Sequence, residues 1–131
     1  MRITNYTTAY HSIFWFAVDN AGHILVADSS EGSVPSFVEE DETRTEKLSR
    51  ILANKNAIEH LHHNSMPIDQ LASKGYFYFR GDDFDGTLYH MVAKPDCPMN
   101  IRDLDAEAQR LLNMQKVPFI IENTDHFTID K

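Results

Sequence analysis

Two apolar runs on either side of a glycine-bearing turn constrain the fold of this chain more than any other feature. The first run, Ile13–Val18, is rich in aromatic and β-branched residues, and the second, His23–Ala27, follows the turn at residues 19–22. Such residues favour strands, and Gly22 tolerates the positive φ of a tight turn. We therefore predict a β-hairpin. Both alternating sets of Ile13–Val18 are apolar, which predicts an interior strand that is covered on one face and partly covered on the other.

The rest of the chain alternates between helix patterns and further hairpins. Two later hairpins are predicted, one from Tyr76–Arg80 and Thr87–Ala93, the other from Val117–Ile121 and His126–Asp130. Helices are predicted over Thr43–Ala53, Ala57–His63 and Pro67–Ser73, with a last one that begins near Asp103. Short connections between neighbouring strands require antiparallel pairing. The fold class is therefore α+β, a mostly antiparallel five- or six-stranded sheet with two to four helices packed on one face.

Capping chemistry predicts where several helices begin and end. Thr43 and Glu46 have the spacing of a capping box, in which each side chain accepts a backbone N–H of the first turn. Asp103 is the predicted N-cap of the last helix, and Gly75 is expected to end the helix over Pro67–Ser73.

The length and charge of the chain limit the number of domains and the kinds of partner that it can bind. A chain of 131 residues fits a single domain, residues 1–131. With 20 acidic against 12 basic residues the net charge is −8, which repels a phosphate backbone and argues against nucleic-acid binding. The same charge favours encounter with a basic protein partner, although acidity that only maintains solubility is the simpler explanation.

The compartment is predicted from what the chain lacks. Cys97 is the only cysteine, so an intrachain disulfide is impossible. The longest apolar stretch, Ile13–Val18, is too short to cross a bilayer, and residues 1–11 lack the apolar run of a secretion signal. We expect a cytoplasmic protein with no membrane partner.

The acidic residues fall into two groups, which are the main candidates for a binding site. The first group comprises Asp28, Glu31, Glu39, Glu40, Asp41 and Glu42, and the second comprises Asp82, Asp83 and Asp85. Repelling carboxylates are relieved by a cationic surface, so we interpret the first group as a partner-binding surface with Trp15 as its apolar anchor. The alternative is a solvated loop face whose acids favour the start of a helix.

The sequence patterns that would indicate metal binding or nucleophilic catalysis are weaker than the acidic groups. His60, His62 and His63 could hold a metal, but no further ligand pattern accompanies them, and a polar helix face is the alternative. Residues 81–86 do not have the ligand spacing of a calcium-binding loop. Ser29, Ser30 and Cys97 lack the sequence context of an activated nucleophile. We expect no catalytic residue and no cofactor.

The first hairpin also carries a resemblance to a known group. The shared pattern is an aromatic pair, Asp, Gly, an aliphatic strand and a turn with Gly-x-Val-Pro. It is met here by Trp15, Phe16, Val18, Asp19, Gly22, Ile24, Asp28, Ser29, Glu31, Gly32, Val34 and Pro35. In this respect the chain resembles small bacterial immunity proteins of polymorphic toxin systems, in the style of the SMI1/KNR4-like group. Ser29-Ser30 departs from the glycine pair typical of that pattern, and no functional residue is transferred.

This resemblance implies a non-catalytic binding or inhibitor role, such as neutralising a basic nuclease toxin. The sequence leaves two alternatives open. One is a metal-dependent enzyme or metal-binding protein that uses the cluster from His60 to His63. The other is a structural subunit that forms a homodimer or larger homo-oligomer through an exposed sheet edge.

Overall fold

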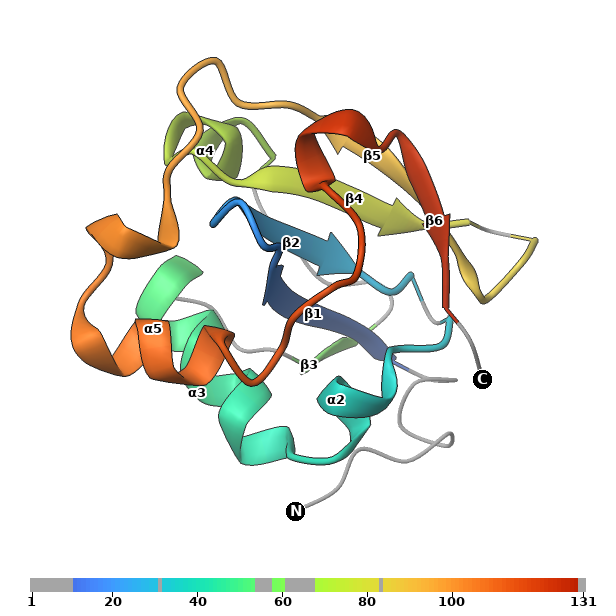
Figure 1. The fold of residues 1–131 in the computed structure, drawn as a ribbon. Helices are drawn as coiled ribbons and strands as arrows, with labels where there is room; N and C mark the ends of the chain where they lie inside the picture. Colours follow the sequence, from blue (N-terminus) through green and yellow to red (C-terminus); the bar gives the residue numbers. More distant parts are fainter. Residues whose placement is uncertain (1–10, 31, 54–57, 61–67, 83, 130–131) are drawn as a thin grey trace.

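An open six-stranded sheet forms the centre of the fold (Figure 1). The computed structural model describes residues 11–30, 32–53, 58–60, 68–82 and 84–129. The strands are β1 (His11–Val18), β2 (Ile24–Asp28), β3 (Ile58–His60), β4 (Phe77–Gly81), β5 (Leu88–Ala93) and β6 (His126–Thr128). Their spatial order is β3-β1-β2-β4-β5-β6. All neighbours pair antiparallel except β2 and β4, which are parallel. The predicted α+β class is confirmed.

Helices cover the sheet unequally. They are α2 (Ser36–Glu39), α3 (Glu42–Ala53), α4 (Ile68–Ser73) and α5 (Ala106–Leu112), with the single turns η1 (Ile101–Asp103) and η2 (Ile121–Asn123). Three of them, α3, α4 and α5, pack on one face through Leu48, Leu71 and Leu111. The short helix α2 and the chain after α5 cover the opposite face, where Val38 and Ile121 are buried. Figure 1 shows this last segment crossing in front of the strands.

Strand β1 lies at the centre of both cores. Ile13, Trp15 and Ala17 belong to the core beneath α2 and the C-terminal segment. Phe14, Phe16 and Val18 belong to the core beneath α3, α4 and α5. The predicted interior strand is therefore confirmed, and it is covered more completely than the sequence indicated, because every side chain from Ile13 to Val18 is buried.

The helices begin at other caps than those predicted. The Asp41 carboxylate accepts the backbone N–H of Arg44 at 3.0 Å, so α3 begins one residue before Thr43. Likewise Asp105, not Asp103, caps α5 by accepting the N–H of Ala108 at 2.8 Å. In both helices an aspartate two positions from the predicted cap supplies the acceptor instead. Gly75, at φ +98°, follows α4 as predicted.

Two predicted elements are wrong. Ile58–His60 forms a strand, not part of a helix over Ala57–His63, because it pairs with the open edge of β1 from His11 to Ile13. Val117–Ile121 forms no strand with β6, which pairs with β5 instead. The chain there makes one short bridge to Val18, reaches Pro118, which has no N–H for a ladder, and then buries Ile121 on the face of the sheet.

Candidate functional site

Trp15 is a core residue and cannot be the surface anchor that the sequence suggested. Its side chain is completely buried, and its Nε1–H donates to the Tyr89 hydroxyl at 3.2 Å. The indole meets the rings of Phe37, Tyr89 and Phe127 edge to face, with centroids 5.5 to 6.2 Å apart. The alternating pattern of β1 is apolar on both faces, so the sequence alone could not decide the exposure of this residue.

Asp28 is also enclosed, which corrects its assignment to a binding surface. It ends β2 with only 5% of its surface exposed, and its Oδ1 accepts the backbone N–H of Ser30 at 2.9 Å. The nearby hydroxyl of Tyr78 has a pKa raised well above its usual value of 10.0, first by burial and then by the Asp28 charge. Glu31 lies outside the described residues.

The remaining four predicted residues stay together and form the turn between α2 and α3. We call Glu39, Glu40, Asp41 and Glu42 the acidic turn. Glu40 is the most exposed, with 67% of its side chain accessible. Asp41 is used to cap α3, and Glu42 begins that helix. Glu39, at the end of α2, is half-buried.

Arg44 supports the acidic turn from inside. It is only 6% exposed, and its Nε donates to Oε1 of Gln115 at 2.9 Å. One terminal nitrogen donates to the carbonyl of Phe37 in α2 and lies 3.9 Å from Glu40. Gln115 in turn donates to the carbonyl of Phe16 at 2.6 Å. This guanidinium therefore ties α2, α3 and β1 together and is directed away from solvent.

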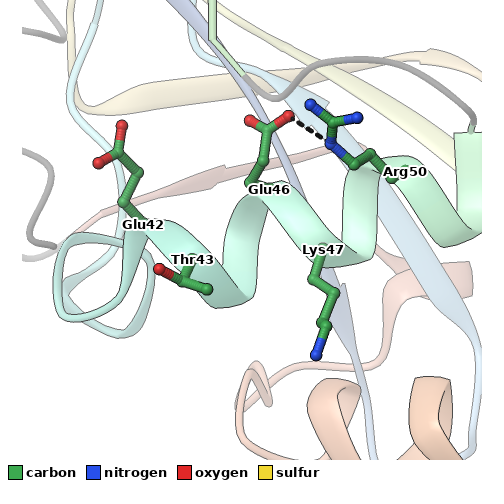
Figure 2. Close-up of a pocket in the computed structure, with 5 residues that line it drawn as sticks. All are labelled: Glu42, Thr43, Glu46, Lys47 and Arg50. Atoms are coloured by element: carbon green, nitrogen blue, oxygen red, sulfur yellow. Dashed lines mark hydrogen bonds and ion pairs between the residues drawn. The ribbon is translucent and has the colours of Figure 1, made fainter.

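A surface hollow of about 340 Å³ lies against the first half of α3, next to the acidic turn. Figure 2 shows Glu42, Glu46 and Arg50 projecting to one side of the helix, with Thr43 and Lys47 on the other. The Arg50 Nε lies 3.1 Å from Glu46, and Lys47 reaches 3.3 Å to Glu107 on α5. Within the described part of the chain, no ion pair involves Glu42. The hollow therefore has its uncompensated negative end beside the acidic turn.

Asp82 and Asp85 of the second acidic group lie in the loop of residues 82–87, between β4 and β5, which we call the Phe84 loop. Asp83 lies outside the described residues. Because β2 and β4 are parallel neighbours, their carboxyl ends lie at the same edge of the sheet. The loop after β2 therefore runs beside the Phe84 loop, and Ser33 donates its N–H to the carbonyl of Gly86 at 2.7 Å. A Cβ on Gly81 would lie 2.3 Å from the carbonyl oxygen of Ser29, so the approach requires glycine. The sequence did not predict this contact, because β2 and β4 are separated in the chain by helices and no local pattern indicates that the two strands pair.

Asp82 organises the Phe84 loop. Its Oδ2 accepts the backbone N–H groups of Phe84 and Asp85 at 2.9 and 2.8 Å, and its Oδ1 lies 3.0 Å from Nε2 of His90. The Phe84 and Asp85 N–H groups, followed by His90, hold the pKa of the Asp82 carboxyl below its usual value of 3.8. The Thr87 hydroxyl and N–H likewise lower the pKa of Asp85. Both carboxylates therefore stay ionised at every physiological pH.

We expect the hydrogen bonds that Asp82 accepts in this loop to be lost only at low pH. A carboxyl group whose pKa is lower in the folded protein than in the unfolded chain stabilises the folded protein when it is ionised. This stabilisation is complete above the unfolded pKa and is lost as the pH falls through the folded pKa. The change in the amide NMR shifts of Phe84 and Asp85 that accompanies protonation of Asp82 should therefore have its midpoint below the usual aspartate value of 3.8. Asp82→Asn should perturb both amides already at neutral pH. A midpoint above the usual value of 3.8 would contradict the assignment.

A second cavity, of about 220 Å³, is apolar and lies between α2 and the C-terminal segment. Its lining is aromatic, aliphatic and hydroxyl-bearing: Trp15, Pro35, Ser36, Phe37, Val117, Pro118, Phe119, Phe127, Thr128 and Ile129. None of these side chains is an acid or base that titrates near neutral pH, so the cavity offers no general acid or base.

The histidine cluster is only partly described. His60 belongs to β3, where its backbone pairs with His11, so this residue is in a strand and not in the predicted helix. His62 and His63 lie outside the described residues. Among the residues that are described, no group of three or more His, Cys, Asp or Glu side chains could hold a metal ion.

Comparisons with known proteins give no further guide. No protein-family model, no curated protein and no solved structure matches the chain. No helix in the described ranges has the length and apolar character needed to traverse a lipid bilayer.

Proposed function

We propose that this chain is a non-catalytic protein-binding module that presents its acidic turn to a basic protein partner. The observation that best supports the proposal is the opposite placement of charges around Glu40. Its carboxylate is 67% exposed and lies 3.9 Å from the guanidinium of Arg44, but that guanidinium is itself buried and donates to Gln115, so the outer side of the Glu40 carboxylate stays open to a partner. A cation supplied by another protein is the natural complement of such a surface.

The α3 hollow extends this surface. Glu46 follows Glu42, the last residue of the acidic turn, along one side of the helix (Figure 2), so a basic segment laid against α3 would meet successive carboxylates. Arg50 at the far end would disfavour a partner segment that is basic throughout. Such charge patterning sets the orientation of a bound segment as well as the rate of encounter.

The proposal includes the role implied by the resemblance of the first hairpin, that of a cytoplasmic bacterial immunity protein. Such a protein would cover the basic surface of a toxin, for example a nuclease, and block its substrate. Neither a cofactor nor a nucleic acid is needed for this action. A net charge of −8 favours rapid association with a cationic partner.

Neutralising the acidic turn is expected to slow association with the native partner. The test variant is Glu40→Gln/Glu42→Gln, which spares the capping Asp41. The control, Asp96→Asn/Asp125→Asn, removes the same charge from exposed positions elsewhere. After crosslinking in the native cell identifies the partner, association of the purified pair is measured at low and high salt. We expect the test variant to associate about 3- to 10-fold more slowly at low salt, with the difference diminishing at high salt.

Three results would overturn the proposal. Equal association rates for the test and control variants would show that the acidic turn is not the contact. Stoichiometric zinc or manganese in protein purified without a histidine tag would favour a metal protein instead. A discrete homo-oligomer that lacks any other partner would favour the structural-subunit interpretation.

A further inference from the structure

Phe84 is exposed to an extent that sets it apart from every other large apolar residue that the structure describes. Its exposed fraction is 99%, whereas the next highest value is 53%, for Met114. Single apolar residues at a surface are common, but most of them are partly covered by their neighbours. The Phe84 ring stands fully clear of the protein at the tip of the β4–β5 hairpin.

The loop that carries this ring is held in place by hydrogen bonds on both sides of it. Asp82 accepts the N–H of Phe84 itself, and Asp85 accepts both the N–H and the hydroxyl of Thr87, at 3.0 and 2.7 Å. At the base of the loop Asp82 donates its N–H to the carbonyl of Leu88 at 2.8 Å. An aromatic side chain whose own backbone is already held by hydrogen bonds loses less conformational entropy when a partner covers it.

The surroundings of Phe84 indicate the chemistry of the surface that it fits. Asp82 and Asp85 lie on either side of Phe84 in the loop, and backbone and side-chain hydrogen bonds lower the pKa of each carboxyl, so both are charged at neutral pH. Beside the loop is a shallow hollow of about 240 Å³, lined by Arg80, Gly81, Asp82, His90 and Val92. Arg80 is the one constantly charged cation of that lining, and it reaches toward Ser30, 3.5 Å from its hydroxyl.

We propose that Phe84 is an anchor that inserts into an apolar pocket, bordered by lysine or arginine side chains, on a protein partner. This inference depends on the proposed function in one respect, which is that the partner is a basic protein. The contact itself is separate from the acidic turn. Buried aromatic residues ringed by polar contacts supply most of the affinity in many interfaces. Asp82 and Asp85 would then select a basic rim around the receiving pocket.

A second copy of this chain is the less favoured occupant. The aromatic cavity beneath α2 is large enough for a phenyl ring, but none of its lining residues is a lysine or arginine. Two molecules that each carry a net charge of −8 also repel one another.

Photocrosslinking followed by affinity measurements tests the anchor. The full chain is expressed in its native cell with p-benzoylphenylalanine replacing Phe84, and a control chain carries the same group in place of Met114. The protein crosslinked at position 84 is then purified and titrated with wild type, Phe84→Ala, Phe84→Leu and Met114→Ala. We expect Phe84→Ala to weaken binding roughly 10- to 100-fold and Phe84→Leu to weaken it less, with Met114→Ala within about twofold of wild type. The crosslinked peptide should border an apolar pocket with basic residues around it.

Because the ring makes no packing contact, each Phe84 variant should keep the thermal midpoint of the wild type, so an affinity loss cannot be ascribed to unfolding. Phe84→Ala binding within twofold of wild type would overturn the anchor. So would identical crosslinked products from positions 84 and 114, or a crosslinked homodimer. The Glu40→Gln/Glu42→Gln variant separates the two proposals, because it tests the acidic turn alone and leaves Phe84 in place.

Discussion

Replacing Trp15 with alanine is expected to lower the free energy of unfolding by about 3–5 kcal/mol, the usual loss for a large aromatic residue in a core. The indole is fully buried among three aromatic rings, and its N–H is bonded to Tyr89. The truncation would leave a cavity in the centre of the sheet and remove that hydrogen bond. Since a domain of this size is stable by only about 5–15 kcal/mol, the loss is a large part of the total.

Chemical denaturation followed by circular dichroism measures this loss, because Trp15 is the only tryptophan and its fluorescence disappears with it. Trp15→Phe provides the matched variant. It keeps an aromatic ring in the core and should cost less, about 1–3 kcal/mol for the lost volume and hydrogen bond. A loss below about 1 kcal/mol for Trp15→Ala would mean that the residue lies at the surface after all, as an anchor would.

Replacing Arg44 with leucine is expected to have the second largest effect, a loss of about 3 kcal/mol. The guanidinium donates to Gln115 in the segment after α5 and to Phe37 in α2. Leucine can fill part of the space, but it leaves the Gln115 oxygen and the Phe37 carbonyl without these donors. Lysine would not restore them, because it has a single nitrogen at the end of its chain and cannot reproduce the planar donor geometry.

Arg50→Leu is the control for Arg44→Leu, because Arg50 lies on the same helix with most of its side chain exposed. Its ion pair with Glu46 is a surface contact between residues four apart, so the change in stability should stay within about 0.5 kcal/mol. Equal effects of Arg44→Leu and Arg50→Leu would show that Arg44 is not the link between α2 and α3. The unfolding midpoint in urea distinguishes these outcomes.

Arg44 also shows how a structural residue affects the candidate binding surface. Its contact with Phe37 holds the end of α2 close to the start of α3, and the acidic turn lies between them. Whether Arg44 is exposed or buried depends on Gln115, which is 71 positions away in the chain.

Much of the secondary structure followed from local pattern. The hairpin of β1 and β2, the helix α3 and the hairpin of β4 and β5 were all predicted, because periodicity and turn residues lie within each segment. The failures occurred where a distant partner competes with local preference. Ile58–His60 became a strand because the edge of β1 was available, and Val117–Ile121 left the sheet to cover its face.

The candidate site was less predictable than the fold. Of the residues chosen from sequence, Glu39, Glu40, Asp41 and Glu42 remained together because they are consecutive in the chain. Trp15 and Asp28 proved to be buried. Phe84 was overlooked, although the sequence held a signal for it: one aromatic residue surrounded by aspartates and bounded by glycines in a hairpin loop.

The sequence by itself determined the two hairpins β1–β2 and β4–β5, the helix α3, the α+β class and the acidic character of the protein, since these depend on composition and on neighbours within a few positions. Only the tertiary structure decided that β2 and β4 lie side by side in parallel, that Arg44 is directed inward beneath the acidic turn and that the Phe84 ring stands in solvent. These outcomes depend on how whole elements pack. The free energy of packing is shared among residues far apart in the chain, so no local pattern encodes it.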